Sequence, residues 1–94
     1  MTTTEIHLDS TVALRATLPR NISSGTVSLL YGDAEDPYTA VIKDVRAEET
    51  DVAAPLSALP LEANSNIEIK WKITYGDGTV EVLPPRGDIL KIVE

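Results

Sequence analysis

The sequence contains no cysteine, which excludes disulfide-bonded scaffolds, zinc ribbons, iron–sulfur sites and thiol catalysis. It contains one histidine, so a metal site built from several histidines is excluded as well. Basic residues are scarce, because 8 lysines and arginines stand against 15 aspartates and glutamates and leave a net charge of −7. This charge argues against nucleic acid as a partner, since phosphate backbones are bound by clustered lysine and arginine.

Long apolar runs are also missing, and none approaches the ~20 residues that a membrane-spanning helix needs. The start of the chain, Met1 to Glu5, lacks the basic and apolar segments of a secretory signal. We therefore expect neither a membrane partner nor secretion by a signal peptide. The length of 94 residues and the 43% hydrophobic content are typical of one globular domain. We expect residues 1–94 to form that domain, with residues 1–4 as a flexible terminus.

Apolar residues at every second position are the strongest pattern in the sequence. The pattern is clearest in residues 66–75, where Ile69, Trp71 and Ile73 fall on one face and Lys70 and Lys72 on the other. Such alternation predicts a strand with one core face and one solvent face. It places Trp71 in the core rather than on an exposed sugar-binding platform. Weaker alternation predicts further strands at 5–8, 11–18, 27–31, 38–45, 80–83 and 89–93.

Turn-forming residues separate these segments. Gly76-Asp77-Gly78 predicts a tight hairpin. Residues 84–87 (PPRG) are predicted to separate the last two strands, because proline is excluded from central strands. Residues 55–64 predict one helical turn or an apolar loop over one end of the core, since Pro60 would end a helix. The fold class that follows is all-β: a single antiparallel β-sandwich, immunoglobulin-like, of about seven strands.

Two groups of polar residues have the composition of a reactive site, and each has a simpler explanation. His7 and Asp9 would share one face of a strand, but no third catalytic group accompanies them, so we expect an exposed edge histidine. Asp33, Glu35 and Asp36 offer oxygen ligands for calcium, but their spacing differs from that of an EF-hand loop. We expect a solvated turn there. The sequence therefore predicts no catalytic residue, no metal ligand and no cofactor, and the protein is expected not to be an enzyme.

Other charged motifs are also given structural interpretations. The acidic stretch from Asp44 to Asp51, with Glu48 and Glu49, is expected to protect an edge strand from pairing with another chain. Lys70 and Lys72 are expected to form a solvated face rather than a nucleic-acid patch. Residues 86–88 spell the integrin tripeptide Arg-Gly-Asp, which we interpret as a turn before the last strand.

The C-terminal part of the chain has a composite pattern. It runs through IKWKITY (69–75), GDGT (76–79), VEVLP (80–84) and GDILKI (87–92). This pattern resembles the N-terminal immunoglobulin-like domain of tailed-phage baseplate upper proteins and related small phage virion modules. Residues 25–29 resemble an earlier strand of that family. The resemblance covers about residues 10–93, residues 66–93 are its informative part, and it implies no catalytic residues.

The resemblance implies a non-enzymatic structural module of a phage or phage-derived particle: a decoration, adaptor, tail or baseplate component. Its expected partners are other virion proteins, and its expected location is the virion, or the host cytoplasm before assembly. Family members usually continue beyond this domain, whereas this sequence stops at Glu94, so we expect a stand-alone module. One alternative is a stand-alone ligand-binding accessory module for carbohydrate or another small molecule, which exposed aromatics would favour. A further alternative is an acidic protein that mimics nucleic acid.

Open sheet edges suggest where a partner binds. The predicted strand at residues 11–18 carries one charge, Arg15, and no proline, so it or the segment 5–8 is expected to pair with a partner strand. On it we predict Thr11, Ala13, Arg15 and Thr17 as partner contacts. Because a charge of −7 opposes self-association, we expect a monomer or a weak homo-oligomer that salt strengthens.

Overall fold

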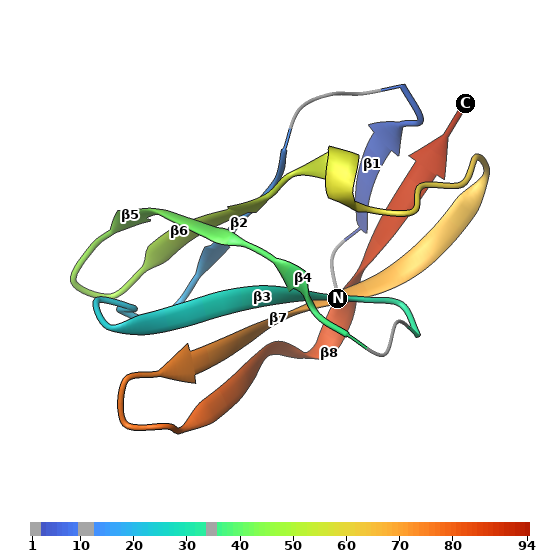
Figure 1. Ribbon diagram of the computed structural model, residues 1–94. Coiled ribbons are helices and arrows are strands. Elements are labelled where there is room, and N and C mark those ends of the chain that lie inside the picture. The colour runs from blue at the N-terminus through green and yellow to red at the C-terminus, as the bar shows by residue number, and fades with distance from the viewer. Residues whose placement is uncertain (1–2, 10–12, 34–35) are drawn as a thin grey trace.

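Two β-sheets packed face to face make up the protein (Figure 1). The computed structural model describes residues 3–9, 13–33 and 36–94, apart from the side chains at positions 58, 85 and 86. These residues form eight strands and one short 3-10 helix. In chain order they are β1 (Thr3–His7), β2 (Leu14–Leu18), β3 (Gly25–Tyr31), β4 (Tyr38–Thr39), β5 (Val41–Val45), β6 (Thr50–Ala54), η1 (Leu56–Ala58), β7 (Ser65–Tyr75) and β8 (Val80–Val93).

The order of the strands is that of an immunoglobulin-like sandwich. The larger sheet has the order β1-β8-β7-β3-β4 and the smaller sheet the order β2-β6-β5. Strands B, E and D of an immunoglobulin domain share one sheet, and strands G, F and C share the other. In this protein β2, β6 and β5 correspond to strands B, E and D, and β8, β7 and β3 correspond to strands G, F and C. The predicted fold class is confirmed, with eight strands in the described residues instead of about seven.

Alternate residues of β7 form the centre of the core. Ile69, Trp71 and Ile73 are buried, and Trp71 is only 1% exposed. Leu29 of β3 and Val52 of the facing sheet belong to the same buried cluster. Removing such side chains from water stabilises the fold by ~1.5–3 kcal/mol each. The period-two pattern of residues 66–75 therefore predicted both the strand and its buried face.

A buried threonine fixes the link between β2 and β3. The side-chain hydroxyl of Thr50, in β6, donates to the carbonyl of Arg20 at 2.8 Å and accepts the N–H of Ile22 at 2.9 Å. Both Thr50 and Ile22 are fully buried. The hydroxyl satisfies two backbone groups where the chain leaves the smaller sheet for the larger one, and buried backbone groups without partners are costly.

Two of the predicted connections have the expected form. The helical turn η1 follows Pro55, and Leu56 and Leu59 are buried at the end of the core. Residues 76–78 connect β7 to β8 as a hairpin, in which the N–H of Gly78 donates to the carbonyl of Tyr75 at 2.9 Å. Gly78 has a φ of 91°, which glycine adopts without strain.

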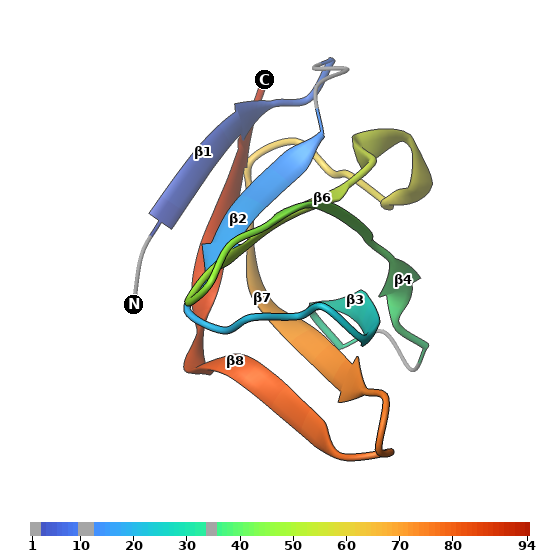
Figure 2. The ribbon, with the colours of Figure 1, turned by 90° about the vertical axis from the view of Figure 1, so that its left-hand side faces the viewer.

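The prediction that residues 84–87 separate two strands is wrong, because β8 runs through them. β8 pairs with β7 on both sides of these four residues, but Lys70 is the one β7 residue that faces them, so they form a large bulge. β1 pairs with residues 89–93 of β8, so the first half of β8 is an edge (Figure 2). Prolines are tolerated at an edge bulge because no ladder hydrogen bond is lost. The Arg-Gly-Asp tripeptide thus lies in a strand and not in a turn.

Residues 38–54 also differ from the prediction. The expected single strand at 38–45 is two strands, because the chain crosses from the larger sheet to the smaller one between β4 and β5. Val41, at the start of β5, is 46% exposed. The acidic stretch 44–51 includes the start of β6, a central strand that the sequence analysis missed.

The N-terminal strand departs from the prediction in two ways. Thr3 and Thr4, expected in a flexible terminus, belong to β1 and lie opposite Ile89 and Leu90 of β8. This pairing is parallel, whereas the other strand pairs of the described chain are antiparallel. The edge position predicted for residues 5–8 is confirmed for β1.

Replacing Trp71 with alanine should destabilise the protein by ~3–5 kcal/mol, the usual cost of deleting a large buried aromatic side chain. Small domains have a total stability of ~5–15 kcal/mol, so the variant should melt far below the wild type. Val80→Ala is the control, because Val80 is 50% exposed and its truncation should change stability by less than ~0.5 kcal/mol. Urea denaturation measures both, and a native tryptophan emission like that of water-exposed indole would contradict the assignment.

Candidate partner-binding face

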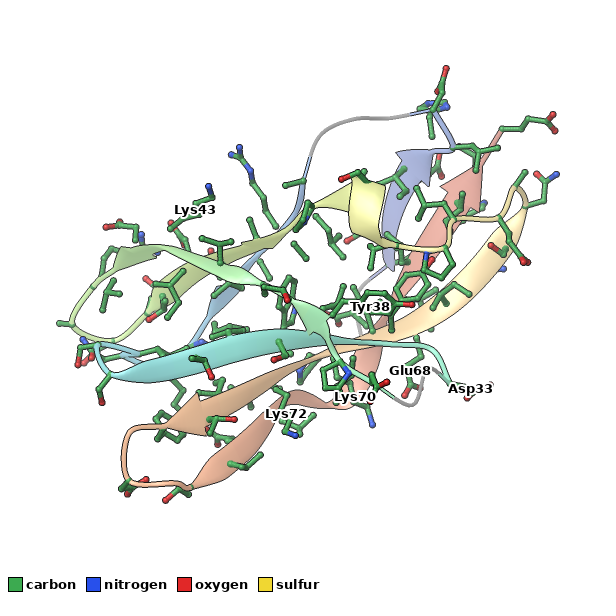
Figure 3. The ribbon with its side chains drawn as sticks, viewed as in Figure 1. Asp33, Tyr38, Lys43, Glu68, Lys70 and Lys72 are labelled. Atoms are coloured by element: carbon green, nitrogen blue, oxygen red, sulfur yellow. The ribbon has the colours of Figure 1, made fainter. Side chains whose placement is uncertain are left out.

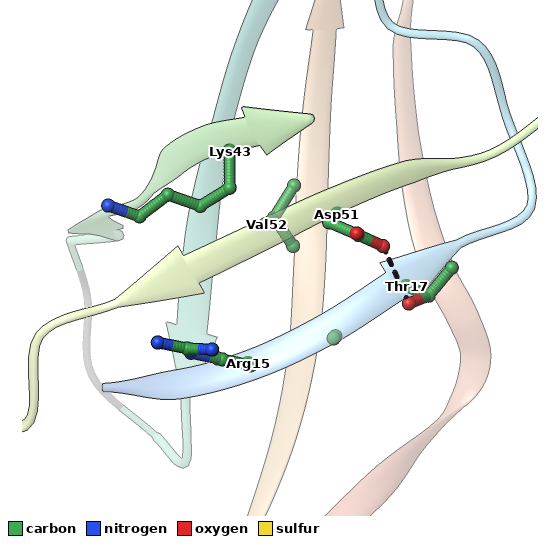
Figure 4. A pocket seen from close by; sticks show the side chains of 6 residues that line it. Arg15, Thr17, Lys43, Asp51 and Val52 are labelled. Atoms are coloured by element: carbon green, nitrogen blue, oxygen red, sulfur yellow. Dashed lines mark hydrogen bonds between the residues drawn. The ribbon is translucent and has the colours of Figure 1, made fainter. Parts of the chain in front are cut away.

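The outer face of the β2-β6-β5 sheet has a hollow of about 560 Å³. Its lining is Arg15, Ala16, Thr17, Lys43, Asp51 and Val52. Figure 4 shows Arg15 and Lys43 extending in the same direction from β2 and β5, on either side of β6. The hollow is open to solvent along the outer face of the sheet.

The alternation of β2 and β6 directs these side chains outward. In β2, Leu14 and Leu18 are buried against the larger sheet, so Arg15 and Thr17 point to solvent. β2 and β6 are in register, which places Thr17 opposite Asp51. A one-residue slip would exchange the two faces and place Arg15 in the core.

Lys43 reaches the hollow because β5 is irregular at this point. Ile42 pairs with Val52 and Asp44 pairs with Asp51, so Lys43 is one extra residue without a partner in β6. Such a β-bulge re-aims the side chains of the bulged strand. Lys43 was missed as a site residue because its position depends on the pairing with β6, which the sequence analysis had not predicted.

Arg46 holds the acidic residues beside the hollow. Its Nη1 and Nη2 donate to Oδ2 and Oδ1 of Asp51 at 2.9 and 2.8 Å, and Nη1 also donates to Asp44 at 3.0 Å. The Thr17 hydroxyl donates to Oδ1 of Asp51 at 2.8 Å. These hydrogen bonds, first from Arg46 and then from Thr17, lower the pKa of Asp51 from 3.8 to about 2. The Asp51 charge is therefore neutralised locally.

Arg15 and Lys43 differ from Arg46 in having no ion pair with any described residue. Arg20 also has a partner, because its Nε and Nη2 both bind the carboxylate of Glu81 at 3.1 Å. The hollow thus carries two unpaired positive charges on a protein whose net charge is −7. Arginine and lysine in this setting favour a carboxylate ligand.

The structure places the four predicted contact residues differently. Arg15 and Thr17 both line the hollow. Ala13 is half-buried just before β2 and does not line it. Thr11 lies outside the described residues.

The other residues considered for chemistry stay separate. His7 and Asp9 are both exposed, and no hydrogen bond between them occurs in the described structure. Asp33 and Asp36 are exposed, Glu35 lies outside the described residues, and no metal-binding cluster occurs within residues 3–9, 13–33 and 36–94.

The two lysines on β7 lie on the outer side of the larger sheet, away from Lys43 (Figure 3). Lys70 lies 3.5 Å from the carboxylate of Glu68. Lys72 has no ion pair in the part of the chain that the structure describes. It therefore offers a comparison for the unpaired cations of the hollow.

Comparison with protein-family models, curated proteins and solved structures finds no match to this chain. Within the described residues, no helix has the length and apolar character needed to cross a membrane.

Replacing Arg46 with glutamine should weaken the dependence of stability on acid pH. The pKa of Asp51 in the folded protein, about 2, lies below its ordinary value of 3.8. The charged carboxylate therefore favours folding above pH 3.8, and this contribution is lost as the pH falls through about 2. Without Arg46 the pKa of Asp51 moves back toward 3.8, so stability should fall less steeply across this range.

Urea denaturation at pH values from ~2 to ~6 measures this difference, because this range includes both the folded and the ordinary pKa of Asp51. Arg15→Gln is the matched control, because Arg15 makes no ion pair with a described carboxylate. It should keep the wild-type slope. An Arg46→Gln slope equal to that of the wild type would show that Arg46 does not set the Asp51 pKa.

Proposed function

We propose that this chain is a non-enzymatic structural module of a phage or phage-derived particle, acting as a decoration, adaptor, tail or baseplate component. The proposal rests first on the resemblance of residues 66–93 to phage immunoglobulin-like domains. That resemblance implies an immunoglobulin-like sandwich, and the strand order of this chain is of that type. The proposed location is the virion, or the host cytoplasm before assembly.

The observation that carries the proposed mode of action is the pair of unpaired cations over the β2-β6-β5 hollow. Arg15 and Lys43 lie on either side of β6, and Asp51, the carboxylate among the residues that line the hollow, is already bound by Arg46. An incoming carboxylate therefore meets two free donors and little repulsion from Asp51. The partner that fits is an acidic surface or segment of another virion protein.

The edge of β2 adds a second means of contact. β2 pairs with β6 on one side, and on its other side no described strand pairs with it. An exposed strand edge binds an extended segment through main-chain hydrogen bonds. A partner strand beside β2 would place its acidic side chains next to Arg15, so the edge and the hollow form one continuous binding surface.

The aromatic residues give little support to a carbohydrate-binding module. Trp71 and Tyr31 are buried, and Tyr38 and Tyr75 are half-buried. A sugar-binding platform requires an exposed ring face, so the carbohydrate alternative lacks the feature that would favour it.

Charge reversal at the hollow should reduce incorporation into particles. In gradient-purified particles from a host that carries this gene, the wild-type chain should occur at a fixed ratio to the major structural protein. Arg15→Glu/Lys43→Glu should lower that ratio at least about tenfold, because like charges facing each other cost several kcal/mol and ~1.4 kcal/mol is a factor of ten.

Lys72→Glu/Lys91→Glu is the matched control, since it makes the same charge change on the larger sheet and neither lysine has an ion pair among the described residues. It should be incorporated like the wild type, once circular dichroism shows that both variants fold. Absence of the wild-type chain from particles would overturn the virion role. Equal loss in both variants would overturn the assignment to this face.

Salt should act in opposite directions on the two kinds of contact. Self-association of the isolated chain is opposed by its charge of −7, so sedimentation should show a monomer or weak oligomer that strengthens as salt is added. The partner contact through Arg15 and Lys43 should weaken with salt instead. A tight oligomer of the isolated chain that dissociates in salt would contradict this electrostatic account.

A further inference from the structure

A second hollow, of about 310 Å³, lies between the turn after β3 and the segment from η1 to β7. Its lining is Tyr31, Gly32, Asp33, Pro60, Glu62 and Ile67, so it shares no residue with the hollow on β2-β6-β5. Its volume is near the lower limit of small-molecule sites, which run from ~300 to ~1,000 Å³. A site of this size suits one side chain or a small amine.

Tyr31, which lines this hollow, has a buried hydroxyl without a partner among the described residues. Tyr31 is 5% exposed, and its hydroxyl is buried without a hydrogen bond to any described residue. Its ring is held edge-on against Tyr38, with the ring centroids 6.0 Å apart and the planes at 83°. Most buried polar side-chain atoms in proteins have a hydrogen-bond partner, so the unpaired Tyr31 hydroxyl needs an explanation, and a bound ligand would supply the missing partner.

The charge at the rim of the hollow is negative. Asp33 and Glu62 are both exposed, and neither carboxylate has an ion pair with a described cation. Glu62 is close enough to act on Tyr31, because burial first, and then the charges of the Tyr38 hydroxyl and the Glu62 carboxylate, raise the pKa of the Tyr31 hydroxyl. Pro60 and Ile67 supply apolar walls beside these polar groups.

The backbone fixes the shape of this site. Gly32 has a φ of 57°, and its N–H donates to the carbonyl of Glu68 at 2.9 Å. A side chain at this position would bring its Cβ to 3.2 Å from Cγ2 of Ile67. The glycine therefore allows the turn after β3 to close tightly on the start of β7 and to carry Tyr31 and Asp33 to the same hollow.

We propose that this hollow binds an organic cation, namely the ammonium or guanidinium group of a lysine or arginine side chain on a partner protein. The Tyr31 oxygen is covered in the free protein, so a neighbouring side chain moves aside when an N–H of the cation donates to it. A phenolic oxygen accepts as well as donates hydrogen bonds. The carboxylates of Asp33 and Glu62 balance the charge, and Pro60 and Ile67 contact the apolar stem. This binding site does not depend on whether the chain is a virion component.

NMR titration of the full chain with n-butylammonium and n-butylguanidinium tests the ligand class. We expect saturable shifts of the amide signals of Gly32 and Asp33. The controls, n-butanol and butyrate, have the same stem without the positive charge and should give no saturable shift. Equal responses to n-butanol and n-butylammonium would overturn the proposal, since the hollow would then be only an apolar surface.

Charge removal at the rim tests the two carboxylates. Asp33→Asn and Glu62→Gln should each weaken the binding of n-butylammonium by about two- to fivefold, as expected for exposed ion pairs. Unchanged affinity in both variants would overturn the proposed charge recognition. A blocked Gly-Lys-Gly tripeptide should shift the same signals, and failure to do so would overturn the assignment to a protein side chain.

Tyr31→Phe and Tyr75→Phe form a matched pair for the hydroxyl. The Tyr75 hydroxyl donates to Oε1 of Glu81 at 2.8 Å, so Tyr75→Phe should lower the melting temperature of the free protein and keep its response to n-butylammonium. Tyr31→Phe should melt no lower than the wild type, because it removes an unpaired hydroxyl, and should lose most of that response. A Tyr31→Phe variant that is destabilised when free, or that binds n-butylammonium like the wild type, would overturn the role of the hydroxyl.

Discussion

The burial of one face of β7 between the two sheets is the constraint on which the rest of the structure depends. Trp71 and its neighbours Ile69 and Ile73 can leave water only if a second sheet covers them, and β2-β6-β5 is that sheet. Once its inner face is committed to this contact, the alternate residues of β2 and β6 must point outward. The positions of Arg15, Thr17 and Asp51 are thus a consequence of core packing.

Charge is distributed unevenly over this scaffold. Arg46 and Arg20 each bind a carboxylate through two nitrogens, and Lys70 lies beside Glu68. Among the residues that the structure describes, Arg15 and Lys43 have no carboxylate partner at one hollow, and Asp33 and Glu62 have no cation partner at the other. A protein with a net charge of −7 therefore has two hollows whose local charges are of opposite sign. Because exposed charges act mainly within a Debye length of ~10 Å, the local arrangement of charge sets the potential at each hollow more than the net charge does.

Irregular pairing creates much of what is specific to this sandwich. The bulge at Lys43 in β5 brings that side chain to the hollow, and the bulge opposite Lys70 lets β8 continue through two prolines. In β5 the interrupted ladder turns the Lys43 side chain toward the hollow. In β8 it leaves room for prolines, which a regular central strand excludes. Rules for regular strands therefore failed at residues 84–87.

The sequence by itself determined the all-β class, the position and buried face of β7 and the hairpin at residues 76–78, and it reduced residues 55–64 to a helical turn or an apolar loop. These features depend on alternation and on turn chemistry, which act over a few neighbouring residues. The sequence also indicated Arg15 and Thr17 as surface contacts, because their strand carries one charge and no proline. Only the tertiary structure revealed β6, whose short segment TDVAA becomes central because strands on both sides pair with it. Lys43 beside Arg15 and Tyr31 beside Glu62 likewise depend on contacts between residues 28 and 31 positions apart, and no local pattern encodes such a meeting.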